Sequence, residues 1–93
     1  MISGEDDQMW PSTKLAGIAM KRLKEHGFNK PHEHLSYPGA GHLIALPYSP
    51  TTVTSIKHPV DGGFYAFGGD PESTYRACVD SWHKKLDYLK KYL

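Results

Sequence analysis

The sequence lacks several features that would assign it to common functional classes. No nucleophile elbow of the type G-x-S-x-G or G-x-C-x-G precedes Asp7, because only six residues stand before this aspartate. Cys78 is the only cysteine, which excludes an internal disulfide and fits a reducing compartment. The chain has no apolar run of roughly 18 residues and no basic region followed by an apolar core at its amino terminus. We therefore predict a cytoplasmic chain without a membrane span.

The charge pattern excludes a broad basic groove. The net charge is +1 and both signs are interspersed, so no nucleic-acid partner is expected. The paired lysines Lys84-Lys85 and Lys90-Lys91 are typical of a solvated helix face. With 93 residues, of which 39% are hydrophobic, the chain is compatible with at most one globular domain.

Two short stretches carry candidate chemistry: the acidic turn at residues 4–10 and the glycine-bounded loop at residues 38–42. A histidine on a loop after a short β-like run, preceded by a carboxylate on the loop after another, is typical of the Asp and His of a Ser/Cys, Asp, His hydrolase. Asp7 and His42 are thus candidate catalytic residues, and we expect their side chains within roughly 3.5 Å of each other. Alternatively, Asp7 and His42 are ordinary loop residues, with Asp6 sharing a capping role near Ser12.

Periodicity predicts two helices. Three- and four-residue spacing predicts an amphipathic helix over residues 13–26, with Ser12 as N-cap and Gly27 as its C-terminal stop. A second helix is predicted from Pro71, with Asp70 as its cap, and one buried stripe made of Tyr75, Val79, Trp82, Leu86, Leu89 and Leu93. Cys78 borders this stripe and is interpreted as a small core residue rather than a reactive thiol.

Strand signals are weaker. Residues 1–3 read as the end of a β-strand, and residues 32–37 read as an edge-type strand bounded by prolines. The pair His32 and His34 would share one strand face and provide two metal ligands, but a third at motif spacing is lacking, so no metal is expected. Residues 43–70 are predicted to be irregular, with Phe64–Phe67 as an apolar anchor.

The predicted elements have more apolar face than they can bury against one another. Two helices and one weak strand lack the sheet that such helices normally cover. We therefore expect a fragment, or a chain that depends on a partner.

A set of short motifs in a fixed order resembles the carboxy-terminal region of the acyl-CoA thioester hydrolase and bile acid-CoA:amino acid N-acyltransferase family. The resemblance covers essentially the whole chain, residues 1–93. It is carried by Ile2-Ser3-Gly4-Glu5-Asp6-Asp7-Gln8-Met9-Trp10-Pro11-Ser12, Lys21-Arg22-Leu23 with His26-Gly27, Tyr37-Pro38 with Gly41-His42, Pro47-Tyr48-Ser49-Pro50, and Gly68-Gly69-Asp70-Pro71 with Val79-Asp80-Ser81-Trp82.

The resemblance implies an α/β fold, namely the carboxy-terminal portion of an α/β hydrolase: a strand tail, a helix, the last strand, a long loop and a C-terminal helix. It implies that Asp7 and His42 are the acid and the base of a triad that cleaves acyl-coenzyme A thioesters, with no further cofactor. The amino-terminal domain, the nucleophile and the oxyanion hole of that family are absent. The chain alone is therefore predicted to be inactive, and to pair with the missing amino-terminal part or with itself.

Other functions remain open from the sequence. The same Asp and His would suit another α/β hydrolase, such as an esterase or peptidase, and the truncated start also fits a non-catalytic remnant or interaction module. The identity of the nucleophile, serine or cysteine, is not given by these residues. Nor is the acceptor of the acyl group, which is water in a hydrolase and an amino-acid amine in an N-acyltransferase.

Overall fold

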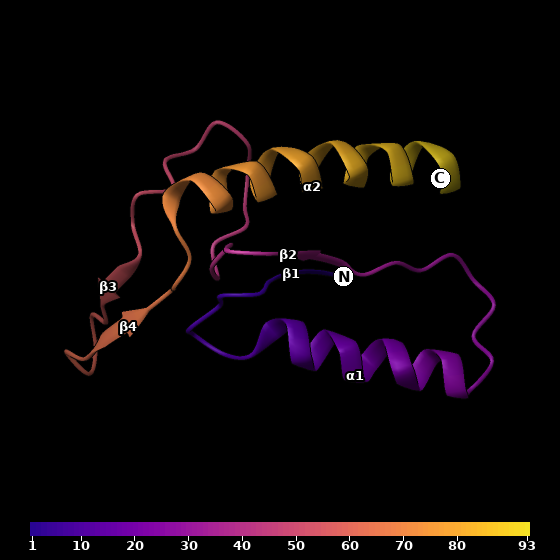
Figure 1. Ribbon diagram of the computed structural model, residues 1–93, viewed down its shortest axis with the longest axis horizontal. Helices are drawn as coiled ribbons and strands as arrows, with labels where there is room; N and C mark the ends of the chain where they lie inside the picture. Colours follow the sequence, from indigo (N-terminus) through magenta and orange to yellow (C-terminus); the bar gives the residue numbers. More distant parts are fainter.

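The computed structural model describes all residues, 1–93, as a mixed α/β arrangement. The elements in chain order are β1 (Ile2–Gly4), α1 (Ser12–Glu25), β2 (Leu35–Tyr37), β3 (Ser55–Lys57), β4 (Phe64–Ala66) and α2 (Pro71–Tyr92). The β1–β2 pair lies between the two helices, with α1 on one side and α2 on the other (Figure 1). Neither helix combines the length and the apolar character that crossing a membrane requires.

Strands β1 and β2 run parallel and are connected through α1. Ile2 is opposite Leu35, and Gly4 is opposite Tyr37. Since parallel strands place their carboxyl ends at the same edge of a sheet, the loops that follow β1 and β2 emerge side by side. The predicted strand at 32–37 is confirmed only over Leu35–Tyr37, where the backbone pairs with β1.

Strands β3 and β4 form an antiparallel hairpin that extends from the body of the molecule (Figure 1). The prediction that residues 43–70 are irregular is therefore wrong for these two strands. Each strand is only three residues long, which is too short for a period-two pattern to stand out. The predicted apolar anchor over Phe64–Phe67 is correct for Phe67, which is 6% exposed, and wrong for Phe64, which is 78% exposed.

The helix ends follow local rules with one exception. Asp70 caps α2 as predicted, accepting a hydrogen bond from the Ser73 backbone N–H at 2.8 Å. Gly27 ends α1 in the left-handed region, with φ +65°, also as predicted. The exception is Ser12, which is the first helical residue and not the N-cap. Pro11 occupies the cap position and provides no side-chain hydrogen bond.

The core consists of small side chains. On α2 the buried residues are Thr74, Ala77, Cys78 and Ser81. The predicted buried stripe is therefore wrong for its large members, since Tyr75 is 40% and Leu86 37% exposed. Small residues let the amino-terminal half of α2 approach the loop after β2, where Thr74 Oγ1 accepts a hydrogen bond from the Gly41 N–H at 3.2 Å. The buried position of Cys78 is confirmed.

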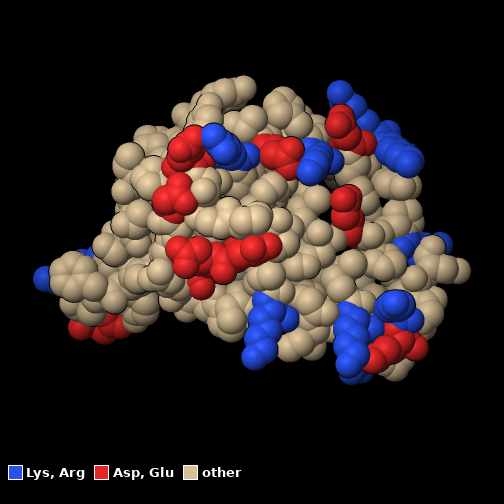
Figure 2. All heavy atoms as spheres, viewed as in Figure 1, with Lys and Arg blue, Asp and Glu red and all other residues tan.

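Apolar surface remains uncovered on both helices, as the sequence predicted. No residue of α1 is fully buried, and Leu15 and Ile18 are 51% and 59% exposed. Leu89 of α2 is 42% exposed. On the face shown in Figure 2, acidic side chains gather in one group near the middle, and lysines and arginines are interspersed with further acidic side chains around it.

Candidate active site

Asp7 and His42 lie together at the carboxyl edge of the β1–β2 sheet. Asp7 stands on the loop after β1, and His42 stands on the loop after β2. The distance from Asp7 Oδ2 to His42 Nδ1 is 3.0 Å, within the range that the sequence predicted. The Asp7 side chain is 3% exposed and the His42 side chain 21%, so the carboxylate is enclosed while the imidazole reaches the surface.

The second oxygen of the Asp7 carboxylate fixes its orientation. Asp7 Oδ1 accepts hydrogen bonds from the backbone N–H groups of Met9, at 2.9 Å, and Trp10, at 3.2 Å. Burial raises the pKa of Asp7, but the hydrogen bonds from His42, from the Ser12 hydroxyl and from these two backbone groups outweigh burial. The net result is a pKa below the ordinary value of 3.8, so Asp7 is ionised at neutral pH.

An ionised carboxylate sets the tautomer of the neutral imidazole. Asp7 can only accept, so His42 Nδ1 carries the proton and donates it to Oδ2. Nε2 is then the basic nitrogen, and it makes no hydrogen bond within the chain. The arrangement has the form of a general base whose free nitrogen is available to a reacting group.

Two aromatic side chains hold the imidazole ring. Trp10 lies edge-on to His42 with ring centroids 4.6 Å apart, and Phe67 is stacked with it at 5.9 Å. Phe67 is buried, whereas Trp10 is 52% exposed. Trp10 thus packs against the candidate base itself.

A third segment, residues 67–69, lies against both loops. The Phe67 carbonyl accepts a hydrogen bond from the His42 N–H at 2.8 Å and another from the Gln8 N–H at 3.3 Å. An isolated antiparallel bridge also joins Asp7 to Gly68. This segment therefore connects the backbone of the acidic loop to the backbone of the histidine loop.

The contact of the three segments requires glycine. A Cβ atom on Gly41 would stand 2.2 Å from the Gly68 carbonyl oxygen, and one on Gly68 would stand 2.0 Å from the Asp6 carbonyl oxygen. Gly68 also has φ +68°, a conformation that other residues rarely adopt. The glycines of the Gly41-His42 and Gly68-Gly69 motifs thus allow the backbones to meet.

Asp6 points away from the pair and does not cap α1. Its Oδ2 accepts a hydrogen bond from the Gly69 N–H at 2.8 Å, which is the role that sequence reasoning missed. The sequence held one indication of this contact, the Gly68-Gly69 pair. Consecutive glycines indicate that another backbone approaches closely, but they do not identify the residue that approaches.

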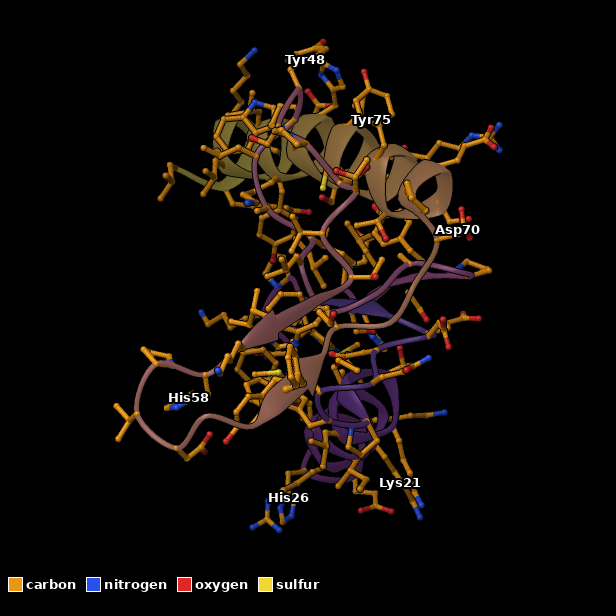
Figure 3. The ribbon with its side chains drawn as sticks, turned by 90° about the vertical axis from the view of Figure 1, so that its left-hand side faces the viewer. Lys21, His26, Tyr48, His58, Asp70 and Tyr75 are labelled. Carbon is orange, nitrogen blue, oxygen red and sulfur yellow. The ribbon has the colours of Figure 1, made fainter.

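The remaining histidines have other surroundings. His34 Nε2 contacts the Ser3 hydroxyl at 2.7 Å, and His32 Nδ1 contacts the Lys30 carbonyl at 2.6 Å, so the two rings have separate partners. His58 lies at the hairpin (Figure 3), and His26 directly follows α1, which ends on the opposite side of the molecule from the hairpin (Figure 1). The structure contains no group of three or more His, Cys, Asp or Glu residues that would hold a metal ion.

Comparison with known proteins identifies the chain's relatives. Its residues 1–93 match the family described as BAAT / Acyl-CoA thioester hydrolase C terminal. It is 39% identical to human acyl-coenzyme A thioesterase 6 and 36% identical to mouse peroxisomal succinyl-coenzyme A thioesterase, over 99% of this chain and 21% of each relative. It is 41% identical to mouse acyl-coenzyme A amino acid N-acyltransferase 1, over 99% of this chain and 22% of that protein.

The chain thus spans about a fifth of the length of these relatives. The matched range, residues 1–93, contains the acidic loop, the Gly-His loop and the Gly-Gly segment that meet around His42. The family match and the range aligned with the relatives both cover nearly every residue of the chain. The chain therefore belongs to the BAAT / acyl-CoA thioester hydrolase C-terminal family.

Proposed function

We propose that this chain contributes the acid and the base of a nucleophile, His, Asp triad that cleaves acyl-coenzyme A thioesters. The observation that carries the proposal is the 3.0 Å contact between the buried Asp7 carboxylate and His42 Nδ1, with Nε2 left free. Family membership supplies the substrate class, since the relatives are named as acyl-coenzyme A thioesterases. The parallel strands with one helix on each side agree with the carboxy-terminal portion of an α/β-hydrolase sheet.

The roles follow from the chemistry of the two groups. His42 Nε2 accepts the proton of a serine hydroxyl or cysteine thiol as that group attacks the thioester carbonyl. Asp7 holds Nδ1–H in place and stabilises the imidazolium that forms. The imidazolium then protonates the departing coenzyme A thiolate, and a second nucleophile releases the acyl group from the enzyme.

No residue of this chain occupies the nucleophile's position. The thiol of Cys78 is buried and lies 3.7 Å from the Leu43 carbonyl oxygen, so it does not face Nε2. In this proposal the nucleophile and the oxyanion hole come from protein outside these 93 residues. Cytoplasmic placement of this chain stays a prediction, and one mouse relative is named as a peroxisomal thioesterase.

A chimera tests the proposal. This chain replaces the matching segment of human acyl-coenzyme A thioesterase 6, and free thiol is followed with a long-chain acyl-coenzyme A. We expect turnover in the chimera and a loss of about 10⁶-fold in the His42→Ala variant. The matched control is His83→Ala, which removes an exposed histidine from α2 and should leave turnover unchanged. A folded His42→Ala chimera that retains turnover would contradict the proposal.

The second candidate function is acyl transfer to an amino acid. It is favoured by the 41% identity to the mouse N-acyltransferase. The Asp7–His42 pair serves either reaction, because only the group that attacks the acyl-enzyme differs. Adding glycine or taurine to the chimera assay separates the two: N-acyl amino acid appears in one case and free fatty acid in the other.

A further inference from the structure

We propose that Asp6 is a positioning residue that holds the Asp7–His42 pair in register through the segment 67–69. This inference rests on the proposed function only for its catalytic consequence, because the positioning itself is a property of the folded chain. The Asp6 side chain makes no hydrogen bond to His42. Its carboxylate instead bonds the Gly69 N–H at 2.8 Å.

The mechanical path from Asp6 to His42 is short. Gly69 is two residues from Phe67, and the Phe67 carbonyl is the acceptor for the backbone N–H groups of both His42 and Gln8. The hydrogen bond that holds Gly69 therefore also restrains the position of the Phe67 carbonyl relative to the acidic loop and the histidine loop. The backbone of Asp6 adds a direct tie, since its N–H donates to the Ala40 carbonyl at 3.0 Å.

The segment is held by the buried Phe67 ring, by backbone hydrogen bonds and by one side-chain hydrogen bond, the one from the Gly69 N–H to Asp6. The hairpin that precedes it extends from the body, and its Phe64 is 78% exposed. On the other side, Asp70 is tied to the Gly39 carbonyl through its N–H at 3.1 Å. Without the Asp6 carboxylate, the Gly68-Gly69 pair loses its only side-chain anchor, and glycine backbones have more freedom to lose than any others.

The chemical requirement is a hydrogen-bond acceptor rather than a negative charge. Asn at position 6 keeps a carbonyl oxygen of the same reach, whereas Ala removes the acceptor. A positioning role therefore predicts that Asp6→Asn restores most of what Asp6→Ala loses. A role based on charge predicts that both variants fail alike.

The test follows the His42 Nδ1 proton by NMR in the full 93-residue chain. Asp6→Ala should accelerate exchange of this proton with water about tenfold or more, because the loss of a hydrogen bond to a charged group permits local opening. Asp6→Asn should stay within about threefold of wild type. The matched control is Glu5→Ala, which removes a neighbouring exposed carboxylate that bonds the Ser36 hydroxyl and should leave the exchange rate unchanged.

The outcomes separate this inference from the proposed function. Wild-type exchange in Asp6→Ala, or equal acceleration in Asp6→Ala and Asp6→Asn, overturns the positioning role. If Asp6→Ala does not fold, protection of the Gly69 amide proton in Asp6→Asn decides instead, and an unprotected Gly69 with an unchanged His42 signal overturns it. In the active chimera, Asp6→Ala should lower kcat about tenfold while KM stays within about twofold. A chimera that is inactive with all residues intact refutes the proposed function and leaves the exchange result standing.

Discussion

At the scale of single residues, adjacent carboxylates in one turn have different tasks. Asp7 is enclosed and faces the imidazole, while Asp6 faces the backbone of Gly69. The difference arises in the turn that follows β1, where the two adjacent side chains reach different partners. One therefore acts on the proton of His42 and the other on the position of the loop.

The two aspartates should differ in their effect on turnover. In the active chimera, Asp7→Asn should reduce kcat by about 10³–10⁴-fold, because the amide misorients the imidazole and favours the wrong tautomer. Asp6→Asn should cost much less, since its oxygen still accepts from Gly69. Thiol release from acyl-coenzyme A is the measurement. Equal losses at the two positions would mean that the turn acts as one structural unit.

The lowered pKa of Asp7 predicts a specific acid sensitivity. A carboxylate whose folded-state pKa is depressed contributes stability above the unfolded value, and this contribution is lost as pH falls through the folded pKa. The free energy of unfolding of the wild type should thus exceed that of Asp7→Asn by a constant amount near neutral pH. This difference should shrink as the pH falls below 3.8. Urea unfolding at a series of pH values measures it, with Asp87→Asn on exposed α2 as a control for net charge. A difference that stays flat from pH 6 to about 3 would contradict the assignment.

At the scale of elements, α2 acts through its first half. The cap at Asp70 and the small residues Thr74 and Ala77 bring the helix against the Gly41-His42 loop. The second half has exposed lysines and leucines. The first turns of α2 therefore both stabilise the helix and position the Gly41-His42 loop.

Loss of the α2 cap should destabilise the chain measurably. Asp70→Ala removes the acceptor for the Ser73 N–H and should lower the free energy of unfolding by about 1 kcal/mol. Asp70→Asn and Asp70→Ser, which still cap, should lose only part of this. Chemical denaturation monitored by circular dichroism measures the change. An Asp70→Ala variant as stable as wild type would show that the neighbouring loop contacts suffice.

At the scale of the whole molecule, the chain buries little of itself. Only 9 of 93 residues are buried, and large apolar side chains are exposed on both helices. The outer edge of β1 has no partner strand. Surfaces of these two kinds are those on which proteins associate.

The isolated chain should self-associate or be marginally stable. Light scattering at increasing concentration should show a mass above 10.4 kDa, or thermal unfolding should be broad and non-cooperative. Adding charge at the exposed position Ile18, as Ile18→Lys, should weaken association, whereas Lys21→Arg on the same helix should not. A monodisperse monomer with a sharp transition would show that the small core is sufficient.

The chain by itself should also release no thiol from acyl-coenzyme A. His42 Nε2 has no hydroxyl or thiol of this chain as a hydrogen-bond partner, so a base is present without a nucleophile to activate. Purified protein incubated with medium- and long-chain acyl-coenzyme A provides the measurement. Thiol release above buffer that His42→Ala abolishes would overturn this expectation.

The sequence by itself determined the local features. Helix spacing, the Asp70 cap and the Gly27 stop depend on neighbouring residues, and all appear in the structure. The contact of Asp7 with His42 joins residues 35 positions apart; it was expected from their two motifs and from the family resemblance, and the structure has it at 3.0 Å. The catalytic roles of Asp7 and His42 stay predictions. So does the place of the chain within a complete α/β-hydrolase sheet.

Only the tertiary structure decided which distant groups meet. The hairpin β3–β4, the small-residue face of α2 and the contact of Asp6 with Gly69 have no local signature, since residues 6 and 69 are far apart in the chain. Any carbonyl can accept from any backbone N–H, and the choice of partner depends on how closely two backbones approach. Here glycines set that approach, and the resulting packing brings the Phe67 carbonyl between the two loops that carry Asp7 and His42.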